Sequence, residues 1–245
     1  MKITERWSRM HLPTNQKAYD MINRIGIISG VDVEAASFLP DQMNEGEPLH
    51  GFSIRSAELG GKYIAITCSG IGKVNAAMAA TILCEHYHVD LLMVIGTAGK
   101  LSDMQSDCFQ IIEAVQGDYG ASRNDGFAHY RAGAWPIGQA HIEPFRAMPM
   151  PDIGLPKVRI VTGDCFVESA DHGRRLHREL GGHLIDMETA AVAQAAERLG
   201  VPWAAIKATT DNADGESAGD FQSNLKRAAR IAAEAAEKMI AALPA

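Results

Sequence analysis

The sequence predicts a single α/β domain in which strands and helices alternate along the chain. Short continuous apolar runs, such as residues 90–99 (DLLMVIGTAG), are typical of strands that are buried on both faces of a sheet. Segments with helical periodicity and alanine-rich faces lie between them, such as residues 74–87 (VNAAMAATILCEHY). A chain of 245 residues without internal repeats or a convincing linker can bury one full core. We therefore expect one domain over residues 21–245, preceded by an N-terminal extension over residues 1–20.

Each expected element follows from its local pattern. The stretch 117–155 is rich in Gly, Pro, Arg and Asp and has few periodic runs, so we expect an irregular insertion there, of a kind that is often functional or at an interface. Helices are expected over residues 74–87, 187–200 and 221–243, the second with Gly200 as its C-cap. Strands are expected over residues 24–29, 63–70, 90–99, 108–115, 158–164, 183–188 and 203–210.

Composition and charge argue against several classes of function. The formal net charge is −7, which disfavours a nucleic-acid partner. No run approaches the roughly 18 apolar residues of a membrane span, and the polar N-terminus lacks the apolar stretch of a secretory signal. The cysteines form no CxxC pair and lie in apolar segments, so we expect reduced core thiols in a cytoplasmic protein without zinc: Cys68, Cys84, Cys108 and Cys165.

Two glycine-rich turns suggest nucleotide-binding loops but do not match them. In SGIGKVNAA, Gly72 and Lys73 are followed by Val74, and no glycine lies at the upstream spacing that a phosphate-binding loop needs. We interpret this segment as a tight strand-to-helix turn, whose helix N-terminus can bind a small anion. The segment GTAG, residues 96–99, lacks the GxGxxG spacing of a dinucleotide site. It is either a simple turn or a glycine loop that lets a ligand approach the backbone.

Two carboxylates that follow predicted strands are the strongest candidates for function. Glu188 lies where the run HLIDME passes into a helix, and Asp211 ends the run WAAIKATTD. An unpaired carboxylate at the edge of a core is costly to desolvate, so it usually has a partner or a task. Ligands of open α/β sheets bind at the carboxyl ends of the strands. Two acids there indicate a polar, hydroxylated substrate and acid–base chemistry.

Six segments, in the same order, resemble the nucleoside phosphorylase/nucleosidase superfamily, and within it the 5′-methylthioadenosine/S-adenosylhomocysteine nucleosidases. They are GIISGVDVE, SGIGKVNAA, VIGTAG, TGDCFVES, LIDMETAAVA and ATTDNAD, and the resemblance extends from Ile25 to the C-terminus. It implies a three-layer fold with a central mixed β-sheet flanked by helices, and a homodimer. It also implies cleavage of the purine–ribose bond of a small-molecule purine nucleoside, with no cofactor or metal.

The resemblance implies roles for four residues around the base and the 5′ group. Asp211 matches the acid that protonates or hydrogen-bonds the purine N7. Phe166 matches the aromatic that stacks on the base, and Val167 the neighbour whose backbone reads the base edge. Phe221 matches an aromatic that lines the pocket of the 5′-substituent.

Four further matches surround the sugar. Glu188 matches the acid that binds the ribose hydroxyls, and Met187 the residue that packs under the ribose. Glu34 matches the acid that activates the water, and Thr97 a hydroxyl residue near the ribose and the water.

The chemistry of the bond is consistent with this arrangement. The bond breaks through an oxocarbenium-like state, so the leaving purine must be neutralised, and protonation by a carboxylic acid is typically worth ~10²–10⁴-fold. Water must approach the anomeric carbon from the other face with a base beside it, as in an inverting glycosidase. Asp211 as acid and Glu34 as base fit that requirement.

Structural explanations remain open for several of these residues. Glu34 can be a helix-start carboxylate stabilised by the helix dipole, and Asp211 can be a helix or turn cap. Met187 and Phe166 can be core residues, and Phe221 can anchor the last helix.

The resemblance favours hydrolysis over phosphorolysis. Phosphorylases hold phosphate with arginines. At one such position this chain has Val94, and its first-strand loop SGVDVEAA carries Glu34 and no arginine. The alternatives are a phosphate-dependent purine nucleoside phosphorylase, a futalosine-type nucleosidase, which GDYGASRNDGF faintly resembles, and a catalytically silent nucleoside-binding protein.

Some positions depart from the family pattern. Lys100 stands where nucleosidases often have a second glycine, Val31 replaces a longer apolar residue, and Thr97 replaces a serine. The 5′-substituent and the choice between adenine and hypoxanthine are therefore open. So is the aromatic that reaches a neighbouring subunit's site, for which the candidates are Phe127, Tyr130 and Trp135.

Overall fold

The computed structural model describes residues 18–214 and 216–244. Most of the expected N-terminal extension therefore lies outside the described residues. Within its last three positions, Ala18 and Tyr19 are buried. None of the helices in the described part of the chain is both long enough and apolar enough to cross a membrane.

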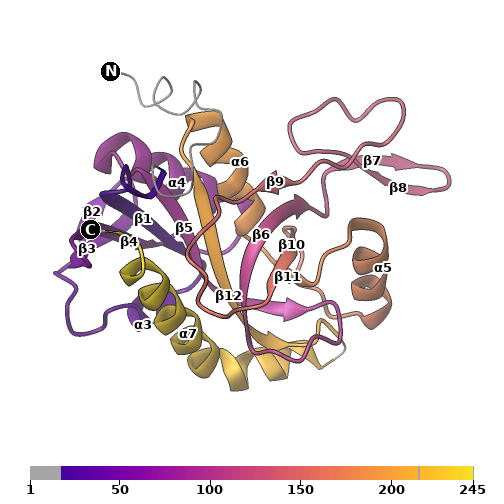
Figure 1. Cartoon of the computed structure of the whole chain (residues 1–245). Helices are drawn as coiled ribbons and strands as arrows, with labels where there is room; N and C mark the ends of the chain where they lie inside the picture. Colours follow the sequence, from indigo (N-terminus) through magenta and orange to yellow (C-terminus); the bar gives the residue numbers. More distant parts are fainter. Residues whose placement is uncertain (1–17, 215, 245) are drawn as a thin grey trace.

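A mixed ten-stranded sheet forms the centre of the molecule (Figure 1). Its order is β11-β10-β6-β12-β5-β1-β4-β3-β2, and β9 pairs with β6 off this path. The strands are β1 (Arg24–Ser29), β2 (Glu47–Leu49), β3 (Phe52–Leu59), β4 (Lys62–Cys68), β5 (Leu91–Lys100), β6 (Cys108–Gln116), β9 (Phe145–Arg146), β10 (Lys157–Thr162), β11 (Leu184–Asp186) and β12 (Trp203–Asp211).

Helices cover both faces of the sheet, which confirms the predicted three-layer α/β fold. The helices α4 (Lys73–Tyr87) and α6 (Thr189–Leu199) share one buried apolar cluster with one face of the sheet. The helices α3 (Asp32–Ser37) and α7 (Ser217–Ala241) pack on the other face (Figure 1). The helix faces that touch the sheet are rich in alanine, which lets helix and strand backbones approach closely.

The central strands match their sequence patterns. Every residue of β12 is buried, and so is every residue of β5 except Lys100. The expected C-cap of α6 is also present, because Gly200 adopts a left-handed conformation with φ 68°.

Several elements were not identified from the sequence, and β3 and α5 are the longest of them. Strand β3 lies between β2 and β4 near the edge of the sheet and buries only Ile54 among its eight residues. Helix α5 (Ala170–Leu180) has the strongly polar sequence ADHGRRLHREL and buries only three residues. The insertion over 117–155 is mostly irregular, as expected, but it contains a hairpin of β7 (Gly120–Arg123) and β8 (Gly126–His129) that projects from the body (Figure 1).

The four cysteines are free thiols, but they are not all in the core. Cys84 and Cys108 are buried and Cys68 is half-buried. Cys165 is exposed, so its prediction as a core thiol is wrong. It lies in the loop after β10 rather than in the strand, which ends at Thr162.

The end of β5 brings together segments that are distant in sequence. Strands β4, β1, β5 and β12 are parallel neighbours, so their carboxyl ends share one edge of the sheet. The last residues of β5 also pair with β11, which runs antiparallel to it, through Leu184–Lys100 and Ile185–Gly99. The exit of β11 therefore lies beside the exits of β1, β5 and β12, and residues from all four strands or the loops after them meet there.

Candidate active site

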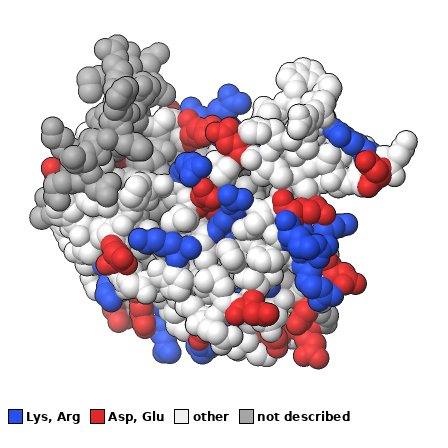
Figure 2. Space-filling model, turned by 45° about the vertical axis from the view of Figure 1, so that its right-hand side comes forward, with Lys and Arg blue, Asp and Glu red and all other residues white. Residues whose placement is uncertain are grey.

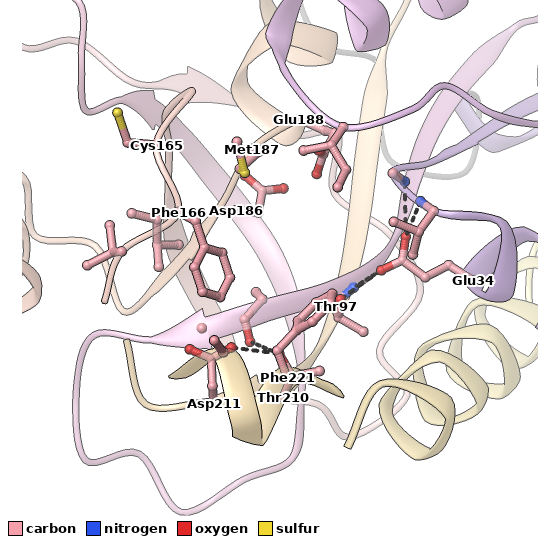
Figure 3. Close-up of a pocket in the computed structure, with 18 of the residues that line it drawn as sticks. Glu34, Thr97, Cys165, Phe166, Asp186, Met187, Glu188, Thr210, Asp211 and Phe221 are labelled. Carbon is pink, nitrogen blue, oxygen red and sulfur yellow. Dashed lines mark hydrogen bonds between the residues drawn. The ribbon is translucent and has the colours of Figure 1, made fainter. Parts of the chain in front are cut away.

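A cavity of about 470 Å³ lies at this meeting point (Figure 3). Asp211 and Glu34 lie on opposite sides of it, and Glu188 and Met187 occupy a third side (Figure 3). The cavity is lined by all eight residues named from the sequence: Glu34, Thr97, Phe166, Val167, Met187, Glu188, Asp211 and Phe221.

Glu34 is held by four hydrogen bonds. It lies in the first turn of α3 and is 3% exposed. Its Oε2 accepts from the backbone N–H groups of Gly30 (3.0 Å) and Val31 (3.1 Å). Its Oε1 accepts from the backbone N–H (2.7 Å) and the hydroxyl (2.8 Å) of Thr97. Glu34 therefore accepts hydrogen bonds at the start of its helix and also lines the cavity, so its structural role does not exclude a functional one.

Gly96 makes room for this carboxylate. Its φ is 148°, and a Cβ atom at this position would lie 2.6 Å from Glu34 Oε1 and 2.7 Å from its Cδ. Real Cβ atoms do not approach other atoms so closely, so only glycine fits. In the GTAG segment, Gly96 thus allows a close approach of the backbone to an acidic side chain.

Asp211 is fixed by its own turn at the end of β12. Its Oδ1 accepts from the backbone N–H of Ala213 (2.9 Å), and its Oδ2 accepts from the hydroxyl of Thr210 (2.8 Å). Gly99 faces the same carboxylate, since a Cβ there would lie 2.8 Å from Asp211 Oδ1. Asp211 therefore caps the turn after β12, which is one of the two explanations that its sequence position left open. Its side chain is 6% exposed and also lines the cavity.

Glu188 lines the cavity beside Asp186 and Met187. It is the N-cap of α6 and accepts from the backbone N–H of Gly72 (3.1 Å), the residue before α4. The SGIGK turn thus presents its helix N-terminus to a carboxylate of the protein itself. Burial raises the pKa of Glu188 to about 7; Lys207 opposes this shift and Asp186 adds to it.

Lys207 and Asp186 are functional candidates that the sequence analysis did not name. The Lys207 ammonium lies 2.9 Å from Asp186 Oδ2 and 3.9 Å from Glu188 Oε2. Lys207 is 1% exposed and lies in the middle of β12. A charged residue inside the apolar run WAAIKATT was a signal in the sequence that could have pointed to it.

Apolar side chains form the remaining wall. The Phe166 and Phe221 rings meet edge to face with centroids 5.9 Å apart, and Phe166 is 46% exposed. This exposure excludes a simple core role for Phe166. Met187 is half-buried and Val167 is buried. Of the positions that depart from the family, Val31 lines the cavity, whereas Lys100 lines a separate hollow of about 580 Å³.

The charge inside the cavity is acidic. Four carboxylates and two threonines line it: Glu34, Asp186, Glu188, Asp211, Thr97 and Thr210. No lysine or arginine is among its described lining residues. The face of the molecule shown in Figure 2, in contrast, carries both signs of charge interspersed. Within residues 18–214 and 216–244, no cluster of three or more His, Cys, Asp or Glu side chains is arranged to hold a metal ion.

A family model and a curated relative match the chain over most of its length. The model described as "Phosphorylase superfamily" matches residues 24–243. A 5′-methylthioadenosine/S-adenosylhomocysteine nucleosidase from Oceanobacillus iheyensis is 32% identical over 226 residues, which cover 88% of this chain and 98% of the relative.

Two solved structures share the fold. The 5′-methylthioadenosine/S-adenosylhomocysteine nucleosidase from S. pneumoniae, determined with a transition-state inhibitor, has a TM-score of 0.78 at 26% identity and covers 90% of this chain and 99% of its own. The native structure of futalosine hydrolase of Helicobacter pylori strain 26695 has a TM-score of 0.77 at 25% identity and covers 90% and 98%.

Proposed function

The chain belongs to the phosphorylase superfamily, and we propose that within it the protein is a nucleosidase. It hydrolyses the N-glycosidic bond of 5′-methylthioadenosine or S-adenosylhomocysteine and releases adenine and a 5-substituted ribose. The relative from Oceanobacillus iheyensis bears the name of that activity. In this proposal the purine lies against Phe166 and Asp211, the ribose against Glu188 and Met187, and the 5′ group against Phe221, all of which line the cavity.

The observation that carries the proposal is an acidic cavity with carboxylates on opposite sides and no cation on its surface. Phosphate would meet Glu34, Asp186 and Glu188 there, without any described arginine or lysine among the lining residues to bind it. Water is neutral and can be polarised by a carboxylate. The same arrangement therefore favours hydrolysis over phosphorolysis.

Asp211 is the proposed general acid. The leaving purine carries negative charge as the bond to ribose breaks, and a proton delivered at N7 neutralises it. Phe166 beside the carboxylate offers a ring face for the base, and the Val167 backbone offers hydrogen bonds to its edge. The bonds from Thr210 and Ala213 hold Asp211 in one orientation, so little rearrangement is needed during the reaction.

Glu34 is the proposed base for water, and Glu188 the acceptor for the ribose hydroxyls. Since Glu34 lies across the cavity from Asp211, water beside it would approach the sugar on the face opposite the leaving base (Figure 3). The Thr97 hydroxyl is within reach of the same carboxylate at 2.8 Å. Glu188 would also favour the positive charge that develops on the sugar.

Release of free adenine from methylthioadenosine in phosphate-free buffer tests this function. The proposal expects full activity without phosphate and free 5-methylthioribose as the second product. Activity that appears only when phosphate is added, with 5-methylthioribose 1-phosphate as the second product, would place the protein among the phosphorylases. Tight binding of an adenosine analogue without turnover of any purine nucleoside would indicate a binding protein.

The 5′-substituent is tested by a substrate panel in the same buffer. Methylthioadenosine, S-adenosylhomocysteine, adenosine, inosine and futalosine differ in the 5′ group or the base. The proposal expects the highest kcat/KM for one of the first two. Futalosine is included because a futalosine hydrolase shares the fold and most of the chain length.

We further propose a cytoplasmic homodimer whose interface includes the turn before α4 and the first half of that helix. Ile71, Val74 and Met78 are 53%, 71% and 47% exposed at helical spacing, and Ile71 also lines the cavity. Of the three candidate aromatics, Tyr130 is buried with its hydroxyl bonded to Gly138, so Phe127 and Trp135 remain to reach a neighbour. Sedimentation velocity of Val74→Glu against the unmodified protein tests this interface, and dimers that persist unchanged would exclude it.

A further inference from the structure

The mechanism proposed above leaves a fully buried charge unused. Lys207 lies in the middle of β12, is 1% exposed, and has the apolar neighbours Ile206 and Ala208 in the strand. Removing an ammonium from water costs several kcal/mol unless it is paired and hydrogen-bonded. A lysine placed there therefore needs carboxylate partners, and those partners are at the sugar side of the cavity.

Asp186 is the closer partner, and the fold fixes it firmly. Its Oδ2 lies 2.9 Å from the Lys207 ammonium. The same carboxylate accepts from the hydroxyl of Thr162 and from both the backbone N–H and the hydroxyl of Thr189. Asp186 is the last residue of β11 and Glu188 follows two residues later, so the anchor and the sugar-binding acid lie on one short stretch of backbone.

We propose that Lys207 is a positioning residue for the sugar-binding acid: anchored by Asp186, its charge keeps Glu188 ionised inside the buried cavity, so that both carboxylate oxygens accept from the ribose hydroxyls. This inference rests on the proposed function. An ionised carboxylate offers acceptors only, whereas a protonated one turns one of its oxygens into a donor. The protonation state of Glu188 thus decides whether it can accept from two neighbouring hydroxyls at once.

The groups that face Glu188 come from four elements. Burial raises its pKa most; among the charges and dipoles around it, Lys207 of β12 lowers that pKa most, and Asp186 raises it. The N–H of Gly72 lowers the pKa further, and Glu34 of α3 raises it. Lys207 itself stays an ammonium, because burial lowers its pKa but Asp186, Glu188 and Glu34 raise it by more. Lys207 is therefore the main group that favours the ionised form of Glu188.

The test is the pH profile of kcat/KM for adenine release from methylthioadenosine, measured for the intact protein and for Lys207→Met. This parameter reports ionisations of the free enzyme. Without the ammonium, the acidic limb should move to higher pH by about one unit or more, so that activity below neutral pH falls about tenfold or more relative to activity at alkaline pH. Asp186→Asn should move the limb the other way, because it removes a neighbouring negative charge and leaves the ammonium. Lys207→Arg should restore the original limb.

Lys62→Met is the matched control. Lys62 is the other lysine buried among the described residues, and its ammonium donates to the backbone carbonyl of Pro244, away from the cavity. This variant is expected to keep the pH profile of the intact protein. A profile that shifts equally in Lys62→Met and Lys207→Met would reduce Lys207 to a structural role and overturn the inference.

Two further measurements keep the inference testable in every case. If Lys207→Met does not fold, the double variant Lys207→Met with Asp186→Asn removes both members of the ion pair, and its acidic limb should lie at higher pH than that of Asp186→Asn alone, because only the ammonium differs between them. If the intact protein releases no purine from any nucleoside, the proposed function fails. The carboxyl carbon of Glu188, followed by NMR titration of ¹³C-labelled protein, then still decides about Lys207. Superimposable titrations of the intact protein and the lysine variant would exclude the role proposed here.

Discussion

The carboxylate of Glu34 accepts two hydrogen bonds from Thr97, one from the backbone N–H at 2.7 Å and one from the hydroxyl at 2.8 Å. This contact joins the first turn of α3 to the carboxyl end of β5. With the bonds from Gly30 and Val31, the acid is satisfied by neutral donors and needs no cation beside it. A carboxylate held in this way has a fixed orientation before any ligand binds.

Glu34→Gln is expected to lower kcat by about 10²-fold or more, because an amide cannot take a proton from water. The amide nitrogen would also face backbone N–H groups that now bond to an oxygen. Loss of such a bond costs about 1–3 kcal/mol of the free energy of unfolding. Single-turnover kinetics and urea unfolding measure the two effects.

Asp32→Asn is the control for this change, since Asp32 lies in the same first turn and is exposed. It should keep near-normal turnover. If Glu34→Gln turned over substrate as fast as this control does, Glu34 would not be the base.

Gly96→Ala is expected to impair both folding and turnover. The new Cβ would lie 2.6 Å from Glu34 Oε1, so either the backbone of β5 or the acid must move. We expect a loss of about 1–3 kcal/mol in the free energy of unfolding, as for other overpacked sites. Gly219→Ala is the control: it lies in α7 with no atom near the added Cβ, and it should be neutral or slightly stabilising. Equal stability of the two variants would contradict the close contact at Gly96.

The sequence predicted those parts of the fold that depend on burial alone. Strands β5 and β12 are continuous apolar runs and are buried along nearly their whole length. Strand β3 and helix α5 were missed because they bury few residues, so their hydrophobic periodicity is weak. The exposure of Cys165 was missed because β10 ends at Thr162, two residues before the end of the expected strand, and Cys165 lies in the loop that follows.

In the candidate site, too, some residues could be predicted from the sequence and others could not. The eight residues matched by resemblance line one cavity. The ion pair of Lys207 with Asp186 could not be predicted, because it depends on β11 lying antiparallel beside the end of β5. The distinction between Tyr130 and Trp135 likewise depends on tertiary packing, which buries the first and leaves the second 83% exposed.

Asp211→Asn is expected to lower kcat by about 10²–10⁴-fold while the fold is retained. Asparagine can still accept from the Ala213 N–H, so the turn at the end of β12 should persist. Circular dichroism and the affinity for a non-hydrolysable adenosine analogue would verify the intact fold and site. Asp214→Asn, three residues along the same loop, is the control, because Asp214 accepts from the Glu216 N–H outside the cavity. Turnover of Asp211→Asn within a few-fold of this control would exclude the acid role.

Glu188→Gln is expected to lose activity. Its free energy of unfolding, compared with that of the intact protein, is expected to increase as pH rises. The pKa of Glu188 is raised from 4.5 to about 7 in the folded state, chiefly by burial. Between these values the folded state keeps a proton that the unfolded state has lost, so the free energy of unfolding of the intact protein falls with increasing pH. Glutamine does not titrate and escapes this loss. The difference between variant and intact protein should therefore grow in favour of the variant from about pH 5 and level off above about pH 7, reaching at most about 3 kcal/mol.

Urea unfolding between pH 5 and pH 7 measures this difference, with Glu168→Gln as a control at an exposed carboxyl near the same cavity. A difference that does not change with pH would show that Glu188 is already ionised in the folded protein across this range, and would contradict a raised pKa.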